Sequence, residues 1–465
     1  MIDFVVFSIL PFIFILGAAV VLHEFGHFIV AKLQGIRVET FSVGFGPRLF
    51  GRRWGTTDYR LSLIPLGGYV KLGGDESNAA VEGAGTSNIP ERERFDLRPR
   101  WQKFLVMVAG PAMNILTALA VVFAAALMNG VQETPSSPTI SRVRGQSEAA
   151  GLRPGDRIVK FNGKENPSLE RIQNDIRLSP GHPLPLTVER AGQRVDLSLT
   201  PSKEVQEGES IGAIDFLPDF GNVPVVAAEV RPGFPAAEAG LREGDRLVSL
   251  NDEPIAGQGT LIPLVQKYKD VPMRLAYERA GQRQETTLKA RIEGDRAFIG
   301  VVPEDDLPYR SVGLVGAAAY AVRRNVEIIR MTGAAFGQIF RGERSARESI
   351  AGPIEIARQS SNVARKFGWA GVFSMLAFLS LNLGVINLLP IPVLDGGAIF
   401  LLVLEAVLGW VGLRLSMTVR ERIQQVGFVM LLLLMGFVIT NDLFKTVTRL
   451  RGSPEQPPAS APANK

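Results

Sequence analysis

Long uncharged apolar runs dominate the hydropathy pattern of this chain. The first extends from Phe4 to Leu22, and apolar character resumes at Phe28. The others extend from Phe104 to Met128, from Gly368 to Leu394 and from Ile423 to Thr440. A helix of about 20 apolar residues is long enough to cross the hydrocarbon core of a bilayer. The pattern therefore predicts four spanning helices, which places both termini on the same side of a membrane.

The first run has a second interpretation, as a cleaved signal peptide. Signal peptides begin with basic residues and end at a cleavage site between small residues. The chain instead begins Met1-Ile2-Asp3, and no such cleavage site follows the run. We therefore expect a retained spanning helix.

Two further apolar segments have patterns that fit a membrane surface better than a span. Gly396 to Leu413 is interrupted by Glu405, which suits a helix near the cytoplasmic interface. Ser311 to Phe340 carries charges on one helical face, as an amphipathic surface helix does. The charges of this face are Arg323, Glu327 and Arg330.

Basic residues in the short loops predict the orientation, because such loops are enriched on the cytoplasmic side. The loop between the first two runs and the loop before the fourth are basic, whereas Lys445, Arg449 and Arg451 argue mildly for the opposite orientation. We expect a multi-pass membrane protein with both termini outside the cytoplasm. The basic residues of the two loops include Lys32, Arg37, Arg48, Arg52, Arg53, Arg60, Lys71, Arg414, Arg420 and Arg422.

The region between the second and third runs contains an internal duplication. The stretch Ala150–Val159 returns with few changes as Ala239–Val248, and Glu189–Arg194 returns unchanged as Glu278–Arg283. The sequence distance between a stretch and its repeat is the same for both stretches, which indicates two copies of one small domain. Short β-rich runs between Gly and Pro residues predict strands in each copy.

The motif A-G-L-x-x-G-D in both copies resembles PDZ domains of the circularly permuted bacterial form. In PDZ domains an exposed strand edge pairs with an extended peptide. The resemblance therefore implies peptide binding, with spacers or a steric gate as the alternative. Both copies are expected in the periplasm.

Composition narrows the chemistry that the chain can perform. Hydrophobic residues make up 46% of it, the net charge is +5, and there is no Cys. Basic residues do not alternate with aromatic ones, so we expect no nucleic-acid partner. Without thiolates, His and carboxylates are the remaining strong ligands for a transition metal. The three His are His23, His27 and His182, and the last lies in a Pro- and Gly-rich turn.

The segment His23-Glu24-Phe25-Gly26-His27 is an H-E-x-x-H motif inside the first apolar run. This spacing places both imidazoles on one face of a helix, where they can bind one Zn²⁺. Glu24 is then placed to take a proton from the attacking water. Ionisable groups within a span are costly and are mostly functional, although a polar patch that binds a neighbouring helix is the alternative.

A catalytic zinc needs a third protein ligand, and Asp395 is the best candidate. It ends the segment N-L-L-P-I-P-V-L-D-G-G, which begins at Asn387. Pro390 and Pro392 break a helix, and broken backbone at membrane depth is tolerated where it lines a cavity. The alternative is an ordinary helix-ending turn with an Asp at the interface.

Together these motifs resemble the site-2 protease family, in particular its branch with tandem PDZ domains, over residues 1 to about 450. The resemblance implies that His23, His27 and Asp395 bind zinc and that Glu24 is the catalytic base. Family members often have His after D-G-G, where this chain has Ala398, but that His is not a ligand. Further shared segments are Gly44–Pro47, Ile64–Val70, Ala109–Asn114 and Ala351–Ile354.

The first basic loop alternates polar and apolar residues with the period of strands. Phe41, Val43 and Phe45 alternate with polar or small residues, as do Tyr59, Leu61 and Leu63. Such a hairpin could add the substrate as an extra strand, and the resemblance implies a membrane-re-entrant hairpin with this role. It also implies substrate contacts, with helix–helix hydrogen bonding as the alternative for the two Asn. The expected substrate-binding residues are Asn382, Asn387, Pro390, Pro392, Gly67 and Gly68.

We thus expect an α-helical polytopic membrane protein with four spans, a membrane-associated β-hairpin and two α+β PDZ-like domains. Its expected function is zinc-dependent hydrolysis of peptide bonds in or beside the spans of single-span proteins, such as anti-sigma factors or remnant signal peptides. The alternatives are an inactive membrane-anchored PDZ scaffold and a membrane zincin of another family with a downstream Glu as third ligand. The expected segments are 1–33, 34–100, 101–129, 130–216, 217–305, 306–367, 368–398, 399–422, 423–447 and a disordered tail at 448–465.

Overall fold

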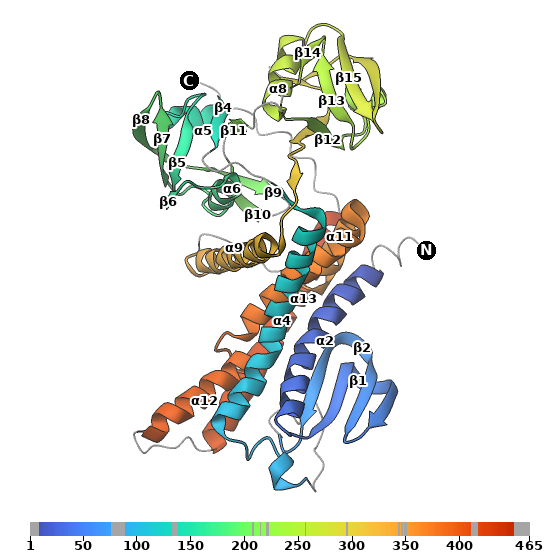
Figure 1. The fold of residues 1–465 in the computed structure, drawn as a ribbon, viewed down its shortest axis with the longest axis vertical. Helices are drawn as coiled ribbons and strands as arrows, with labels where there is room; N and C mark the ends of the chain where they lie inside the picture. The colour runs from blue at the N-terminus through green and yellow to red at the C-terminus, as the bar shows by residue number, and fades with distance from the viewer. Residues whose placement is uncertain are drawn as a thin grey trace. The chain divides into compact units, whose positions relative to one another are not determined.

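The structure is a computed structural model that describes residues 9–75, 89–132, 138–206, 209–213, 215–219, 223–255, 257–293, 296–342, 345, 347, 351–410 and 417–450. Two compact units make up the chain. The first combines residues 1–128 with 313–465, and the second comprises residues 129–312. The helices of the first unit and the sheets of the second are labelled in Figure 1.

The first unit is built from long helices. Among the described residues, four of them are long and apolar enough to cross a membrane, within Leu10–Leu33, Arg100–Asn129, Pro353–Asn387 and Gln425–Val447. The expectation of a polytopic helical membrane protein is therefore confirmed. The helices of this unit are α2 (Leu10–Leu33), α4 (Arg100–Asn129), α9 (Leu314–Phe340), α11 (Pro353–Asn387), α12 (Asp395–Trp410) and α13 (Met417–Leu450).

The third span differs from the expected segment 368–398 at both ends. α11 already begins at Pro353 and carries a break at Gly368, whose φ of 57° interrupts the helix. It ends at Asn387, because Pro390 and Pro392 lack the amide hydrogen that a continuing helix needs. The chain then turns, and the new helix α12 begins at Asp395.

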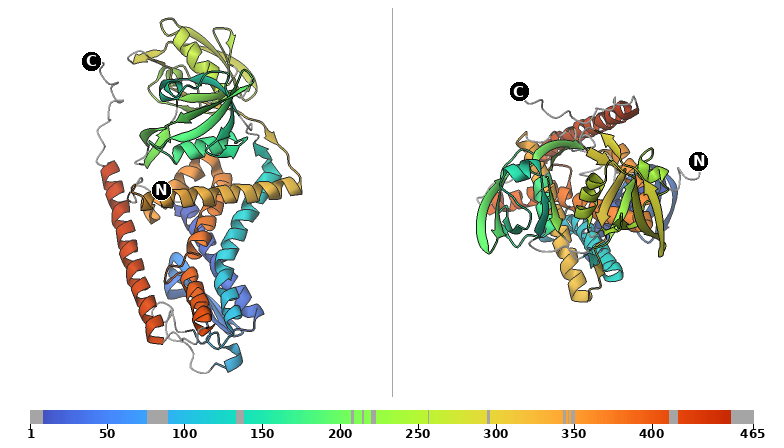
Figure 2. Two further views of the ribbon diagram at one scale, coloured as in Figure 1. Left: turned by 90° about the vertical axis from the view of Figure 1, so that its left-hand side faces the viewer. Right: turned by 90° about the horizontal axis from the view of Figure 1, so that it is seen from above.

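Other expected segments differ from the structure as well. The expected segment 306–367 contains two elements, α9 and the beginning of α11. The last helix begins at Met417 instead of residue 423 and continues to Leu450. The expectation of a disordered tail is therefore wrong for residues 448–450. Residues 1–8 and the rest of the expected tail, 451–465, lie outside the described part. α9 crosses the direction of the other long helices, as an amphipathic surface helix would (Figure 2).

The hairpin after α2 forms a sheet in which each strand folds back. β1 (Val38–Trp54) and β2 (Thr57–Leu72) are antiparallel, and the first half of β1 pairs with both halves of β2. In the described part of the chain, no strand other than β1 pairs with the stretch Gly68–Val70, and β2 also contacts α2. A free edge of this sheet therefore lies at the spanning helix that carries the H-E-x-x-H motif.

The alternation of this hairpin is the reverse of that in a water-soluble sheet. Its buried row is polar: the Ser42 and Ser62 hydroxyls lie 3.0 Å apart, and the Thr57 hydroxyl donates to the Val38 carbonyl over 2.7 Å. Six large apolar side chains in the tip half of the hairpin are exposed instead, whereas Val38, Tyr69 and Leu72 nearer its base are buried. An apolar solvent would suit these exposed side chains, which are Leu49, Phe50, Trp54, Leu61, Leu63 and Ile64.

The second unit contains two repeats with the same strand order. Each forms a six-stranded sheet, β11-β4-β5-β7-β8 with β6 in the first and β19-β12-β13-β15-β16 with β14 in the second. Because β11 pairs with β4, the first repeat extends to Asp219 and the expected boundary at 216 is too early. Buried aliphatic side chains form a separate core in each repeat, with Phe161 and Met273 at their centres.

The elements of the second unit are distributed as follows. Strands of the first repeat are β4 (Thr139–Val143), β5 (Arg157–Phe161), β6 (Lys164–Glu165), β7 (Leu184–Arg190), β8 (Gln193–Leu199), β9 (Ser202–Gln206), β10 (Glu209–Ala213) and β11 (Phe216–Asp219). Strands of the second are β12 (Val225–Val230), β13 (Arg246–Leu250), β14 (Glu253–Pro254), β15 (Met273–Arg279), β16 (Gln282–Leu288), β17 (Arg291–Glu293), β18 (Arg296–Phe298) and β19 (Val301–Asp305). Short helices are η2 (Glu91–Glu93) in the first unit and α5 (Gly145–Ala149), α6 (Leu169–Arg177), α7 (Pro235–Glu238) and α8 (Gln258–Lys267) in the second, where β3 (Val131–Gln132) also pairs with β20 (Tyr309–Arg310).

Each repeat contains the same buried ion pair. The Asp245 carboxylate accepts two hydrogen bonds of 2.7 Å from the Arg279 guanidinium and one of 2.7 Å from the Arg242 amide. Asp156 and Arg190 form the equivalent pair in the first repeat. Burial raises the pKa of the Asp245 carboxyl, but these hydrogen bonds outweigh burial and hold the pKa below its ordinary value.

We expect Asp245→Asn to destabilise the second repeat at neutral pH, because Asn cannot accept the charge-assisted hydrogen bonds of Arg279 and the Arg242 amide as a carboxylate does. A depressed folded-state pKa stabilises the fold above the unfolded pKa of about 3.9, and this contribution disappears as the pH falls through the folded value. Thermal unfolding of both proteins from pH 7 to pH 3 should show the difference between their midpoints shrinking. A difference that stays constant with pH would contradict the assignment.

Candidate metal centre

The two His of the H-E-x-x-H motif lie on one face of α2. They are one helical turn apart, both are buried, and their Nε2 atoms are 3.3 Å apart. The other nitrogen of His27, Nδ1, lies 2.8 Å from the Val106 carbonyl on α4. A proton on Nδ1 donates to this carbonyl, so the lone pair of Nε2 is free to bind a metal.

Asp395 reaches the same point from the first turn of α12. Its carboxylate oxygens lie 3.0 Å from His23 Nε2 and 3.4 Å from His27 Nε2. These three side chains form a cluster whose ligand atoms all lie within 4.8 Å of one another. The sequence-predicted trio, far apart in the chain, is thus brought together.

The spacing of the three donor atoms fits a tetrahedral zinc ion. With metal–ligand bonds of 2.0–2.2 Å, the edges of such a tetrahedron are about 3.3 Å long. The two imidazole Nε2 atoms are 3.3 Å apart, Asp395 Oδ2 lies 3.0 Å from that of His23, and Asp395 Oδ1 lies 3.4 Å from that of His27, so each pair of side chains can span such an edge. Two imidazoles and a carboxylate with one position left open are the donor set of a catalytic zinc.

Two hydrogen-bonded polar side chains, which were not predicted from the sequence, hold the imidazole of His23 from behind. Asn114 on α4 is fully buried, and its amide lies 3.2 Å from His23 Nδ1. Ser380 on α11 contacts the Asn114 side chain over 3.2 Å. When Nε2 binds a metal, Nδ1 keeps its proton and needs an acceptor, which the Asn114 amide oxygen offers in the flipped orientation. The shared segment Ala109–Asn114 was the sequence feature that could have indicated this role.

Glu24 lies between the metal ligands and the free edge of the hairpin. The backbone of Val70 on β2 hydrogen-bonds its carboxylate. A Cβ on Gly68 would lie 3.3 Å from Glu24 Cγ, so the absent side chain lets this strand approach the helix closely. The Glu side chain is therefore placed beside both the metal position and a strand edge.

Glycines also bring the helices around the site together. A Cβ on Gly26 would lie 2.2 Å from the Ala109 carbonyl oxygen, and one on Gly384 would lie 2.9 Å from the Pro111 carbonyl oxygen. Small residues of this kind allow close contact between helices in a membrane. The α2, α4 and α11 helices thus surround the cluster at short distances.

The remaining sequence-predicted residues lie in different places. The Asn387 amide lies 3.3 Å from His23 Nε2, at the cluster. Asn382 instead accepts a 2.8 Å hydrogen bond from Thr332 of α9, which matches the helix–helix alternative. Pro390 and Pro392 lie in the turn that leads to Asp395, and Gly67 packs against the Phe45 ring. His182 lies in an exposed turn.

Comparison with known proteins identifies the family of the chain. The family model described as Peptidase family M50 matches residues 11–434. The chain is 30% identical to the regulator of sigma-E protease RseP of Escherichia coli, with 93% of this chain and 97% of the relative covered. It is 32% identical to protease RseP of Yersinia pestis (94% and 98%) and to a putative zinc metalloprotease of Neisseria meningitidis (96% and 100%).

The chain belongs to peptidase family M50. It is a zinc metalloendopeptidase of the site-2 protease type, and its apolar helices identify it as a membrane protein.

Proposed function

We propose that His23, His27 and Asp395 hold the zinc ion and that Glu24 is the catalytic base. The convergence of these three side chains from α2 and α12 carries this proposal, because one ligand atom of each lies within 4.8 Å of the others. Zinc bound there would polarise the scissile carbonyl as a Lewis acid and make water easier to deprotonate. Glu24 takes the proton of the attacking water and passes it to the leaving amine.

The substrate is an unwound segment of a single-span membrane protein. A helical span hides its carbonyls in intrahelical hydrogen bonds, and an unwound backbone in the membrane needs new partners. The strand edge at Gly68–Val70 offers such partners beside Glu24 and would accept the segment as an additional strand. Asn387, Pro390 and Pro392 would hold it from the other side, together with Gly67 of the hairpin.

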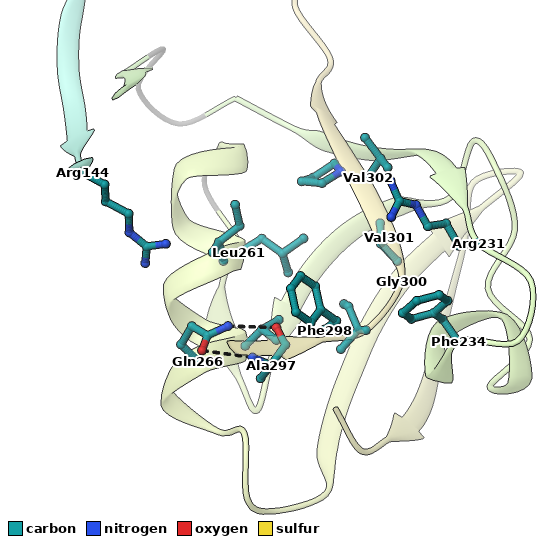
Figure 3. Close-up of a pocket in the computed structure, with 14 residues that line it drawn as sticks. Arg144, Arg231, Phe234, Leu261, Gln266, Ala297, Phe298, Gly300, Val301 and Val302 are labelled. Atoms are coloured by element: carbon teal, nitrogen blue, oxygen red, sulfur yellow. Dashed lines mark hydrogen bonds between the residues drawn. The ribbon is translucent and has the colours of Figure 1, made fainter. Parts of the chain in front are cut away.

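The second repeat offers a peptide-binding groove of the PDZ type. A pocket of about 640 Å³ lies between α8 and the strand β19, which ends its sheet (Figure 3). Leu261 of the helix faces Phe298 across it, and Val265 and Val301 also line it. An edge strand beside an apolar groove is the arrangement by which such domains bind extended peptides. The two repeats, in the periplasm, would bind peptides or exclude substrates whose outer domain is still bulky.

The name of the Escherichia coli relative, regulator of sigma-E protease RseP, suggests the biological substrates. We infer that anti-sigma factors already trimmed outside the membrane, or remnant signal peptides, are cut by this chain. The protein would lie in the bacterial inner membrane with both termini in the periplasm, as the basic loops indicate.

Purified wild type and Glu24→Gln should separate metal binding from catalysis. We expect both proteins to contain about one zinc, because Gln leaves all three ligands in place, and only the wild type to cut a model single-span substrate. The expected loss in kcat is at least about 100-fold, the usual contribution of a general base. Cutting by Glu24→Gln at the wild-type rate, or an absence of zinc from both, would refute the proposal.

A further inference from the structure

The last helix of the first unit, α13, is attached at two points. Among its described side chains, the buried residues are Gly427 near one end and Asn441 and Asp442 near the other. Apart from the half-buried Val438, the apolar side chains described between these points are exposed, Leu433 by 70%. α13 lies at the edge of the helices (Figure 2). Its position therefore depends on a few contacts.

The first attachment is polar and caps another helix. Asp442 is 2% exposed, and its carboxylate accepts hydrogen bonds from the backbone amides of Gly352, Ile354 and Glu355 over 2.9 to 3.2 Å. These amides begin α11, whose N-cap residue Gly352 offers no side-chain cap of its own. A negative charge at a helix N-terminus is favourable. Asp442 thus supplies, from a different helix, the cap that α11 lacks.

The neighbouring Asn441 strengthens this attachment. Its side chain is 3% exposed, and its amide donates a 2.7 Å hydrogen bond to the Arg347 carbonyl. A buried carboxylate and a buried amide in a mainly apolar helix are costly and are retained where they have a function. Neither residue contacts the metal cluster, and neither belongs to a motif of the sequence analysis.

The second attachment lies against the turn that carries the third ligand. A Cβ on Gly427 would lie 2.3 Å from Pro392 Cβ and 3.0 Å from its carbonyl carbon. On the α12 side, a Cβ on Gly397 would lie 2.3 Å from the Ile391 carbonyl oxygen. The turn between α11 and α12 is therefore packed between backbone of α12 and backbone of α13.

This turn contains strained backbone that needs such support. Val393 has a φ of 81°, a conformation that β-branched residues very rarely adopt. Strain of this kind persists only where the surrounding structure imposes it. Asp395 follows two residues later, so the shape of the turn decides where its carboxylate lies.

We propose that Asn441 and Asp442 are positioning residues for the metal centre. The pair fixes α13 to the beginning of α11, and the helix in turn holds Gly427 against Pro392, which keeps Asp395 in place beside the two His. The inference rests on the proposed zinc site. It assigns a role in zinc retention to the carboxylate of Asp442, which contacts none of the proposed zinc-binding residues.

The test combines removal of the anchor with its covalent replacement. Asp442→Ala removes the cap, and Asp442→Asn keeps one acceptor oxygen. A Cβ on Gly352 would lie 2.7 Å from Val438 Cγ1, so Cys at positions 352 and 438 are close enough for a disulfide. No native Cys interferes, because the chain has none. Thr440→Ala is the matched control, since its hydroxyl bonds only to Gly436 of the same exposed face.

Zinc per folded protein, measured along a series of chelator concentrations, is the first readout, and cleavage of a single-span substrate is the second. We expect Asp442→Ala to lose half its zinc at a chelator concentration at least tenfold lower than wild type, and to cut at least tenfold more slowly. Asp442→Asn should lie between the two, and Thr440→Ala should match wild type. The disulfide in the Asp442→Ala background should restore both properties to within about threefold, and reduction should abolish the rescue.

Two results would overturn the proposal. One is wild-type zinc retention in Asp442→Ala. The other is a disulfide-linked variant that forms its bond, elutes as a folded monodisperse protein and still loses zinc like Asp442→Ala. A wild type that binds no zinc would instead count against the proposed metal centre itself.

Discussion

Asp395→Ala should lose its zinc and its proteolytic activity together. Removing a ligand leaves two imidazoles to hold the ion, and loss of even a partner that orients a ligand weakens metal binding 10- to 100-fold. We therefore expect zinc retention to fall more than about 100-fold, with cleavage below detection. Metal analysis after gel filtration and a cleavage assay on the same samples provide the measurement.

Glu405→Gln is the control for this variant, because Glu405 lies on the same helix and is a carboxylate downstream of the motif. We expect it to keep its zinc and its activity. Retention of zinc by Asp395→Ala together with its loss from Glu405→Gln would reverse the assignment. It would favour a zincin with a downstream Glu as third ligand.

Gly110→Ala should disable the metal centre although it changes no ligand. A Cβ at this position of α4 would lie 2.2 Å from His27 Nε2, the atom that faces the metal position. The imidazole would have to move away from the metal position. Overpacking of this kind also lowers the free energy of unfolding by about 1–3 kcal/mol. We expect zinc binding at least tenfold weaker and a comparable loss of cleavage.

Gly17→Ala on α2 is the matched control, because no heavy atom lies within 4 Å of a Cβ at this position. Ala is the better helix former by about 1 kcal/mol, so the thermal midpoint should stay or rise slightly. A Gly110→Ala protein with normal zinc content would show that the helices separate without affecting His27. That result would contradict the tight packing around the site.

The proposed metal ligands could be predicted from the sequence for a simple physical reason. Helical periodicity places His23 and His27 on one face, and the absence of Cys leaves a carboxylate as third ligand. The two Pro before Asp395 correctly indicated broken backbone. Both repeats were also predictable, because identical stretches recur with a constant offset.

The residues that support the site could not be predicted in this way. Asn114 and Asp442 lie in helices and differ from neighbouring polar residues only through partners distant in the chain. The same holds for Asn382, whose contact with Thr332 depends on how α9 crosses α11. The end of α11 at Asn387 also depends on tertiary packing, since a Pro limits a helix without deciding in which turn it stops.

The reversed alternation of the hairpin has a practical consequence for purification. A sheet with a row of Ser and Thr inside and apolar side chains outside is stable only while a lipid-like solvent covers its outer face. Short-chain detergents that cover this face poorly would loosen the strand edge beside Glu24 before they unfold the long helices. Activity should therefore depend on the choice of detergent more steeply than helix content does, and reconstitution into lipid nanodiscs would preserve the enzyme best.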